Sequence, residues 1–363
     1  MNPPELDETN RVILTAYENG VYSNGGELQR RASMELALHV SSVYEGILVS
    51  SNTSGLVASL LAANVRNKHV VISNFTFSAT MHAVILAGGI PILCDVTENS
   101  LEMDSKKLHL ILSNPRYDVA AVMPTRVFGY INDQSDLIQK CQDFKIPIII
   151  DAAAAFPPFS QCWNFKNNAN AEVFSLHASK VFGIGEGGVI VGSTEFIEKI
   201  RKTTNFGVTS GSNEIFEDGL NAKADEFMAA RALVRIKDYG SDVLKRQEFV
   251  NSYKTFFTSY KSIRILEDDK NTVYSYFPII FHSENDLLRA KKLLDPFLVT
   301  RRYYYPTLKS GYKGNAVFLS EENLKVSESV AKRILCLPVY VSFTPEIKEF
   351  IFNVLSKALN GLK

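Results

Sequence analysis

Lys180 and Asp151 are the residues whose types and surroundings most clearly indicate chemistry. Lys180 lies between a short apolar segment that ends at Leu176 and a glycine-rich turn, residues 183–188. Asp151 directly follows the apolar run 146–150, so its carboxylate is placed at the C-terminal end of a buried strand, where open α/β sheets bind ligands. A lysine amine can form a Schiff base, and a carboxylate can keep a pyridine nitrogen protonated. The pair therefore predicts pyridoxal 5′-phosphate (PLP) as a cofactor.

The elements that must position these two residues alternate between apolar β-type runs and helical patterns. Strands are predicted at 47–49, 70–72, 90–93, 119–122, 146–150 and 189–191, and helices at 55–64, 78–87, 134–144 and 194–203. This alternation favours crossover units and a mainly parallel sheet with helices on both faces. The later part of the chain predicts a long helix at 222–239, a strand at 273–281, and helices at 284–294 and 345–359. We therefore predict an α/β fold with a large domain, residues 1–240, and a small C-terminal α+β domain, residues 241–363.

Composition narrows the class of protein further. The 363 residues carry 39 basic and 39 acidic side chains, so the overall charge indicates neither a nucleic-acid partner nor an anionic membrane. No apolar run approaches the roughly 20 residues of a membrane helix, and no secretory leader is visible, so the expected location is the cytoplasm. The four cysteines, Cys94, Cys141, Cys162 and Cys336, are widely spaced. Their spacing argues against a zinc site and a disulfide framework.

A second group of residues is suited to binding an anion and an aromatic ring. Residues 50–55 pass from an apolar strand through small polar side chains into a helix, and the N–H groups and positive end of a helix bind anions. An ordinary helix cap is the alternative interpretation. Phe75 and Phe77 alternate along an extended segment, so one is expected in the core and the other at the site.

The glycines of residues 183–188 also match the dinucleotide fingerprint Gly-x-Gly-x-x-Gly. They lead into the apolar run 189–191, which predicts a strand, whereas the fingerprint requires a helix there. We therefore expect these glycines to let the backbone pass close to the cofactor rather than to bind a dinucleotide.

Taken in order, these motifs resemble the DegT-type sugar aminotransferases, which are PLP enzymes of fold type I. The resemblance covers nearly the whole chain, and it rests on residues 21–25, 53–55, 75–80, 151–153, 174–191, 205–207, 219–223, 301–306 and 337–338. It implies a large seven-stranded-type sheet domain and a homodimer with shared active sites. Many relatives carry Gln or His at the position of Ala154, and this chain has only a methyl group there.

The resemblance also assigns roles to individual residues. Lys180 and Asp151 are the implied catalytic residues, and the implied cofactor contacts are Thr53, Ser54, Phe77, Asp151, Ser175, Lys180 and Asn205. Asn205 is expected to reach the phosphate in the neighbouring subunit, although a plain turn is the alternative for residues 205–207. The implied substrate contacts are Tyr22, Asn24, His177, Lys223, Arg301, Arg302 and Tyr303. Residues 301–306 could bind a pyrophosphate and a planar base, or form a tyrosine-rich strand edge with solvated arginines.

The implied activity is transfer of an amino group from L-glutamate to a keto-6-deoxy sugar nucleotide, with the cofactor cycling through pyridoxamine 5′-phosphate (PMP). The motif variants look most like enzymes that aminate dTDP-4-keto-6-deoxy-D-glucose at C4 to give dTDP-4-amino-4,6-dideoxyglucose for surface polysaccharide or O-antigen synthesis. Amination of a 3-keto sugar and of a UDP-linked 4-keto sugar remain open. Lys180 disfavours the sister dehydratases, which carry histidine there, and Cys336 lies in an apolar run unsuited to a desulfurase. A cofactor-free sensor or scaffold is the alternative outside catalysis.

Overall fold

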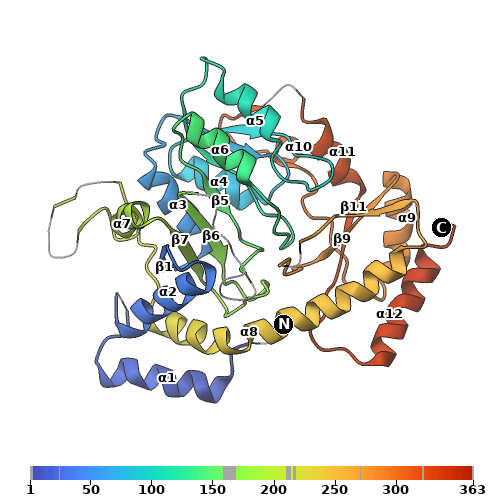
Figure 1. The fold of residues 1–363 in the computed structure, drawn as a ribbon, viewed down its shortest axis with the longest axis horizontal. Helices are drawn as coiled ribbons and strands as arrows, with labels where there is room; N and C mark the ends of the chain where they lie inside the picture. The colour runs from blue at the N-terminus through green and yellow to red at the C-terminus, as the bar shows by residue number, and fades with distance from the viewer. Residues whose placement is uncertain are drawn as a thin grey trace.

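A central sheet organises the first part of the chain (Figure 1). The computed structural model describes residues 3–23, 25–157, 169–209, 214–215, 218–269, 271–320 and 323–361. Within these ranges the strands of the sheet are β1 (Glu45–Val49), β2 (His69–Ser73), β3 (Ile90–Cys94), β4 (Val119–Met123), β5 (Ile149–Asp151), β6 (Ala171–Ser175), β7 (Gly188–Gly192) and β10 (Leu319–Ser320).

Hydrogen bonds join these strands in the order β1-β7-β6-β5-β4-β2-β3-β10. Two four-stranded ladders meet where β4 and β5 lie parallel, through bridges that pair Val122 with Ile148 and Thr125 with Asp151. In the described sheet β7 runs antiparallel to both of its neighbours, and the other strands run parallel to one another. The predicted mainly parallel sheet is therefore confirmed, and β10 adds a short strand at its edge.

Helices cover both faces of the sheet. One face packs against α1 (Leu6–Glu18), α2 (Glu27–Val40), α5 (Ser105–Leu112), α6 (Ser135–Asp143) and α8 (Glu226–Phe257), and the other against α3 (Asn52–Ala62), α4 (Ser78–Leu86) and α7 (Thr194–Thr203). In β2, Val71 faces the first layer, whereas Val70 and Ile72 face the second. Because both faces are buried, the strands are nearly continuous apolar runs, and this is why the sequence revealed them.

A smaller antiparallel sheet forms the core of the C-terminal part. It contains β8 (Ile263–Ile265), β9 (Phe277–Phe281) and β11 (Ile334–Leu337) in the order β11-β9-β8, packed with α9 (Glu284–Leu294), α11 (Lys325–Arg333) and α12 (Pro345–Ala358). The short α10 (Leu308–Gly311) connects this part back to the central sheet. Figure 1 shows α8 running beneath the central sheet toward α9 and α12.

Several predicted boundaries of helices and strands were wrong. The long helix spans 226–257 instead of 222–239, because Asp225 caps its start by accepting a hydrogen bond from the Met228 N–H. The predicted domain boundary at 240/241 therefore falls within α8, and the division into 1–240 and 241–363 stays a prediction. β9 begins at Phe277 rather than at residue 273, because the preceding N–H groups bond to the carbonyls of residues 128 and 129. α3 begins three residues before the predicted start at residue 55.

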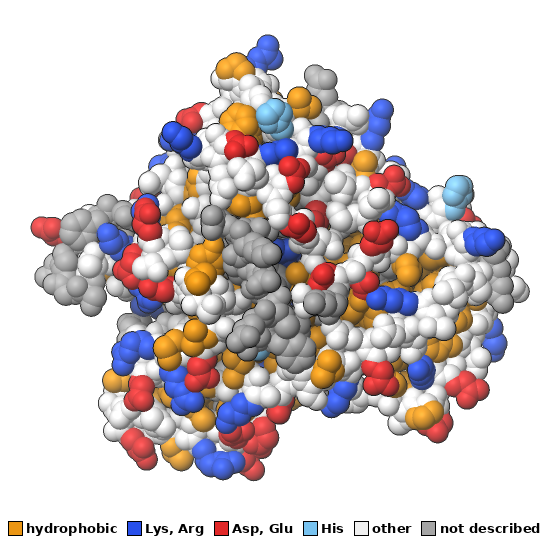
Figure 2. Space-filling model, viewed as in Figure 1, with side chains coloured by type: hydrophobic (Ala, Val, Ile, Leu, Met, Phe, Trp, Pro, Cys, Tyr) orange, Lys and Arg blue, Asp and Glu red, His pale blue; other side chains and the backbone are white. Residues whose placement is uncertain are grey.

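The surface carries charges of both signs. Figure 2 shows lysine and arginine side chains intermixed with aspartate and glutamate over the visible face, in keeping with 39 residues of each sign in the sequence. In the described part of the chain, no helix is both long and apolar enough to cross a membrane.

Candidate active site

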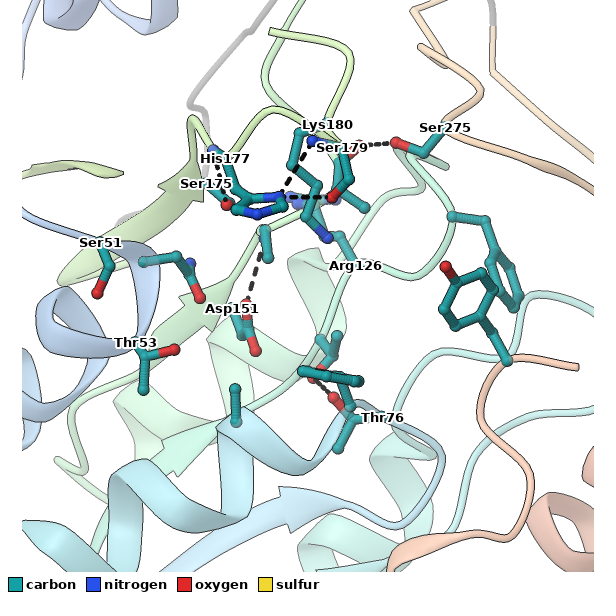
Figure 3. Close-up of a pocket in the computed structure, with 18 of the residues that line it drawn as sticks. Ser51, Thr53, Thr76, Arg126, Asp151, Ser175, His177, Ser179, Lys180 and Ser275 are labelled. Atoms are coloured by element: carbon teal, nitrogen blue, oxygen red, sulfur yellow. Dashed lines mark hydrogen bonds between the residues drawn. The ribbon is translucent and has the colours of Figure 1, made fainter. Parts of the chain in front are cut away.

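A cavity of about 370 Å³ lies at the carboxyl ends of the central parallel strands (Figure 3). Its lining comes from segments that are far apart in the sequence: the start of α3, the segment that enters α4, the ends of β4 and β5, the loop after β6, and residues 303–304. The predicted site residues that line this cavity are Thr53, Phe77, Asp151, Ser175, His177, Lys180 and Tyr303.

Lys180 is held on a tight loop between β6 and β7. Its N–H donates to the His177 carbonyl at 2.8 Å, and a Cβ atom at Gly183 would lie 2.7 Å from the Ala178 oxygen and 3.0 Å from the Lys180 oxygen. Only glycine therefore permits this loop. Burial lowers the pKa of the Lys180 amine, although the nearby Asp151 carboxylate opposes this shift. A lowered pKa increases the fraction of neutral amine, which is the nucleophilic form.

Asp151 ends β5 with its side chain buried in the wall of the cavity. Its Oδ2 accepts a hydrogen bond from Thr80 Oγ1 at 2.7 Å, and its Oδ1 accepts one from the Ala153 N–H at 3.2 Å. Burial raises the pKa of Asp151, while the bonds from Thr80 and Ala153 and the charge of Lys180 oppose the rise. A cation placed in the cavity beside this carboxylate would oppose the rise of its pKa, because opposite charges favour the ionised form.

A chain of threonine hydroxyls stands behind Asp151. Thr80 Oγ1 lies 2.8 Å from Thr76 Oγ1, which in turn lies 2.9 Å from Thr125 Oγ1, and all three side chains are buried. No role was predicted for these three threonines from the sequence. Thr76 precedes α4, which begins at Ser78, so the spacing of Thr76 and Thr80 is not that of two residues on one helix face and gave no signal in the sequence.

The start of α3 forms the anion-binding side of the cavity. Ser51 caps the helix by accepting a hydrogen bond from the Ser54 N–H at 3.1 Å. Asn52 and Thr53, in the first turn, line the cavity together with Ser51 and Ser175. The first N–H groups of a helix lack partners within the helix, so they are free to bind an anion. The Ser54 hydroxyl instead bonds to Ser50 and Ser51, outside the cavity lining, so its predicted contact with the phosphate stays a prediction.

Gly188 brings β7 against this helix start. A Cβ atom there would lie 2.7 Å from both the Asn52 nitrogen and the Ser51 carbonyl carbon, so any side chain would push the helix away. The glycines of the turn therefore serve close packing. They lead into strand β7, as predicted, and not into the helix that a dinucleotide-binding turn requires.

These features fit PLP. The cofactor requires an amine for a Schiff base, a carboxylate for its ring nitrogen and donors for its phosphate. Lys180, Asp151 and the start of α3 place all three around one cavity (Figure 3). Lys180 extends into the cavity from the loop above Asp151.

The two phenylalanines separate as expected from their alternation. Phe75 is fully buried against Phe128 and Tyr304, whereas Phe77 is 59% exposed and lines the cavity. Tyr303 lies at the same wall, where its hydroxyl is 3.0 Å from that of Tyr276. The cavity therefore has one aromatic wall, and ring stacking by Phe77 stays a prediction.

His177 lies at the rim of the cavity with about half of its side chain exposed. Its Nδ1 accepts a hydrogen bond from the Ser179 N–H at 3.0 Å, and its Nε2 lies 3.6 Å from Glu186 Oε1. These contacts fix the ring on the same loop as Lys180. A direct contact with substrate stays a prediction.

The remaining predicted site residues lie outside this lining. Tyr22 accepts a backbone hydrogen bond from Glu226, and Asn24 lies outside the described residues. Asn205 pairs with Asn221, and the Lys223 Nζ lies 4.3 Å from the ring centre of Phe206.

The two arginines of residues 301–306 differ in their surroundings. A second cavity adjoins the one described above. Arg301 pairs through its backbone with Cys336 and lines neither of these two cavities. Arg302 reaches the adjacent cavity, and its guanidinium bonds to Glu284 at 2.9 Å. Their predicted pyrophosphate contacts stay predictions.

The competing chemistries find little support in the described residues. Cys94, Cys141 and Cys336 are buried cysteines outside any disulfide, and burial raises the pKa of the Cys336 thiol, which opposes thiolate formation. No group of His, Cys, Asp and Glu in the described ranges could hold a metal ion. Cys162 lies outside those ranges.

The sequence is similar to those of known aminotransferases over most of its length. Residues 5–356 match the DegT/DnrJ/EryC1/StrS aminotransferase family. The chain is 26% identical over 360 residues to the dTDP-4-amino-4,6-dideoxy-D-glucose transaminase of Shigella dysenteriae, covering 98% of this chain and 96% of that protein. It is 25% identical over 371 residues to the 3-oxo-glucose-6-phosphate:glutamate aminotransferase of Bacillus subtilis, covering 98% and 82% respectively.

A solved structure confirms the fold. The structure of NtdA from Bacillus subtilis with the bound cofactor PMP superimposes with a TM-score of 0.82 at 24% identity, covering 98% of this chain and 83% of that one. The family match spans most of the sequence and includes every residue that lines the cavity. The chain therefore belongs to the DegT/DnrJ/EryC1/StrS aminotransferase family, and PLP is its cofactor.

Proposed function

We propose that this sugar aminotransferase transfers an amino group from L-glutamate to C4 of dTDP-4-keto-6-deoxy-D-glucose, giving dTDP-4-amino-4,6-dideoxyglucose for surface polysaccharide or O-antigen synthesis. The observation that carries the proposal is the cavity that both Lys180 and Asp151 line. The choice of sugar is supported by the similarity to the Shigella dysenteriae transaminase across nearly the full length of both chains.

The residues of the cavity divide the work. When bound, PLP supplies an electron sink for the electrons released at the reacting carbon. Asp151, held by Thr80 and the Ala153 N–H, would keep the cofactor ring protonated at its nitrogen. The α3 start and Ser175, which line the cavity, would hold the phosphate. Lys180 Nζ, whose pKa is lowered, accepts the proton that leaves the donor Cα and returns it in the next step.

A 3-keto sugar is the second candidate acceptor. The similarity to the 3-oxo-glucose-6-phosphate aminotransferase has nearly the same identity and also spans 98% of this chain. That relative is a glutamate aminotransferase, which supports glutamate as the proposed donor. A UDP-linked 4-keto sugar is the third candidate acceptor.

The proposed active form is a homodimer with shared sites. Asn205 and Lys223 lie outside the lining of their own cavity, on neighbouring backbone segments near the α3 start. Phe206 between them is 55% exposed and adopts a positive φ of 60°. An exposed aromatic side chain on a strained loop is suited to a contact with a second subunit, in which Asn205 would reach the partner's phosphate.

The test is incubation of the purified holoenzyme with glutamate and a panel of 4-keto and 3-keto sugars linked to dTDP or UDP. NMR of the product identifies the aminated carbon and its configuration. We expect a C4 amine on the dTDP sugar. A 3-amino product or a preference for the UDP sugar would replace the proposal with the corresponding alternative.

A further inference from the structure

A second cavity of about 530 Å³ adjoins the first. The two cavities share Thr76, Phe77, Tyr303 and Tyr304, and the second is otherwise walled by α4 and residues 302–314. A nucleotide-linked sugar carries its base many bonds away from its ketone. Its remote part must therefore lie outside the cavity that holds the reacting carbon, and the second cavity offers the adjoining space with aromatic walls.

The wall formed by residues 302–314 is fastened to the central sheet by one buried amide, that of Asn74. Asn74 follows β2, is fully buried, and directly precedes the segment that carries Thr76 and Phe77. Its Oδ1 accepts a hydrogen bond from the Lys309 N–H at 2.9 Å, and its carbonyl accepts one from the Leu308 N–H at 3.2 Å. Asn74 thus ties α10 to the strand end beside the catalytic cavity.

The amide nitrogen of Asn74 bonds to side chains of α11. Asn74 Nδ2 donates to Ser327 Oγ at 2.8 Å and to Glu328 Oε1 at 3.4 Å. Glu328 in turn accepts hydrogen bonds from Thr307 Oγ1 and from Ser310 Oγ, the latter at 2.6 Å. Residues 307–310 are therefore held twice, once by Asn74 directly and once through Glu328.

We propose that Asn74 is a positioning residue for the amino acceptor: through Glu328 and α10 it fixes the wall of the second cavity, which binds the nucleotide part of the sugar. The inference rests on the proposed function, because it takes the acceptor to be a nucleotide-linked keto sugar. Glutamate has no nucleotide to place there. Loss of the tie should therefore act on the acceptor half-reaction and spare the donor half-reaction.

The test replaces Asn74 in the holoenzyme and measures both half-reactions separately. Asn74→Asp keeps the acceptor for the Lys309 N–H but turns the donor into an oxygen that faces the Glu328 carboxylate. We expect KM for dTDP-4-keto-6-deoxyglucose to rise about tenfold, as for a buried polar group that loses its partner. The rate of the glutamate half-reaction, followed by cofactor absorbance, should stay within about twofold of wild type.

A reciprocal exchange distinguishes positioning from general damage. In Asn74→Asp/Glu328→Gln the amide and the carboxylate change places, so Gln at position 328 can donate to Asp at position 74, and the acceptor KM should return most of the way to wild type. Asn170→Asp is the matched control. Asn170 accepts a hydrogen bond from the Ile148 N–H at 2.9 Å near the start of β5, away from both cavities, so this change should leave the acceptor KM unaltered.

Ser310→Ala provides a variant whose folding is not in question, because Ser310 is exposed. It removes one tie to Glu328 and should raise the acceptor KM about threefold, less than the loss of a buried partner. An unchanged acceptor KM in both Ser310→Ala and Asn74→Asp, or an equal loss in both half-reactions without recovery in the exchange variant, would overturn the inference. Failure of the wild type to aminate any nucleotide-linked keto sugar would instead refute the proposed function.

Discussion

Thr80 offers the most direct test of how the fold prepares Asp151. It donates a 2.7 Å hydrogen bond to Asp151 Oδ2 and is itself fully buried. Thr80→Val keeps the branched shape of the side chain and removes the hydroxyl. The carboxylate then loses a donor in a place where water cannot replace it.

The expected magnitude follows from the type of bond. A hydrogen bond to a charged group contributes about 1.5–3 kcal/mol, and a pKa unit corresponds to about 1.4 kcal/mol. Losing the Thr80 bond should therefore raise the pKa of Asp151 beyond the rise that burial already causes. A smaller fraction of the carboxylate would then be ionised and able to keep the cofactor ring nitrogen protonated, and the glutamate half-reaction should slow about 10- to 100-fold.

The assay is rapid mixing of holoenzyme with excess glutamate, with the half-reaction followed by cofactor absorbance. Thr80→Ser restores a hydroxyl at the same position and should recover most of the rate. Thr76→Val acts one hydrogen bond further away and should slow the reaction less than Thr80→Val. A Thr80→Val rate within twofold of wild type, or an equally slow Thr80→Ser, would refute the role given to this bond.

The other predictions address the remaining parts of the argument. Lys180→Ala should fold and bind PLP noncovalently but lose turnover, and borohydride reduction of the wild type followed by mass spectrometry should place the cofactor on Lys180 and on no other lysine. Asp151→Asn should retain PLP and lower activity by orders of magnitude, since an amide cannot keep the ring nitrogen protonated; a near-normal single-turnover rate would remove Asp151 from the mechanism. Burial raises the pKa of Glu102 to about 7. Between about pH 4.5 and 7 the folded protein therefore binds a proton at Glu102 that the unfolded chain does not bind. The free energy of unfolding consequently falls as the pH rises through this range. Glu102→Gln should therefore flatten this dependence and be more stable than wild type at pH 8 by about 1–3 kcal/mol in urea unfolding, while a parallel pH profile would contradict the assignment. Mixed dimers of Lys180→Ala and Asn205→Asp subunits should regain at most about half of the activity per dimer, because one of the two sites would be intact; verified heterodimers without any activity would count against shared sites.

The parts of the site that depend on local sequence pattern could be predicted from the sequence. Asp151 was found because a buried parallel strand is an apolar run, and a carboxylate at its end has no role in the core. Phe75 and Phe77 separated correctly because alternation along an extended segment has a fixed period of two. The loop of Lys180 was visible through its glycines, whose positions are set by backbone approach rather than by long-range packing.

The parts that escaped sequence reasoning depend on contacts between distant segments. The threonine chain joins Thr125 to Thr76 and Thr80 across 45 to 49 positions, and Asn74 meets Lys309 across 235. Serine, threonine and asparagine are common at helix caps and turns, so their types alone do not indicate a long-range partner. The start of α3 was misplaced for the same reason, since a Ser51-Ser54 capping box resembles a polar loop until the helix is seen.

The opposite pKa shifts of Lys180 and Asp151 share one cause. Burial favours the neutral form of both groups, lowering the pKa of the amine and raising that of the acid. The charged form of each group is therefore disfavoured until a suitable ligand binds. A cation beside Asp151 would favour its ionised form, and conversion of the Lys180 amine to an imine would remove the need to bury a charged amine. In a structural ion pair each partner would favour the charged form of the other, so the pKa of the acid would fall and that of the amine would rise. The opposite shifts at Asp151 and Lys180 are the pattern expected of a reactive site. The chain of threonine hydroxyls supports Asp151, and the glycine-containing loop positions Lys180. These contacts allow the folded protein to keep both side chains in the cavity.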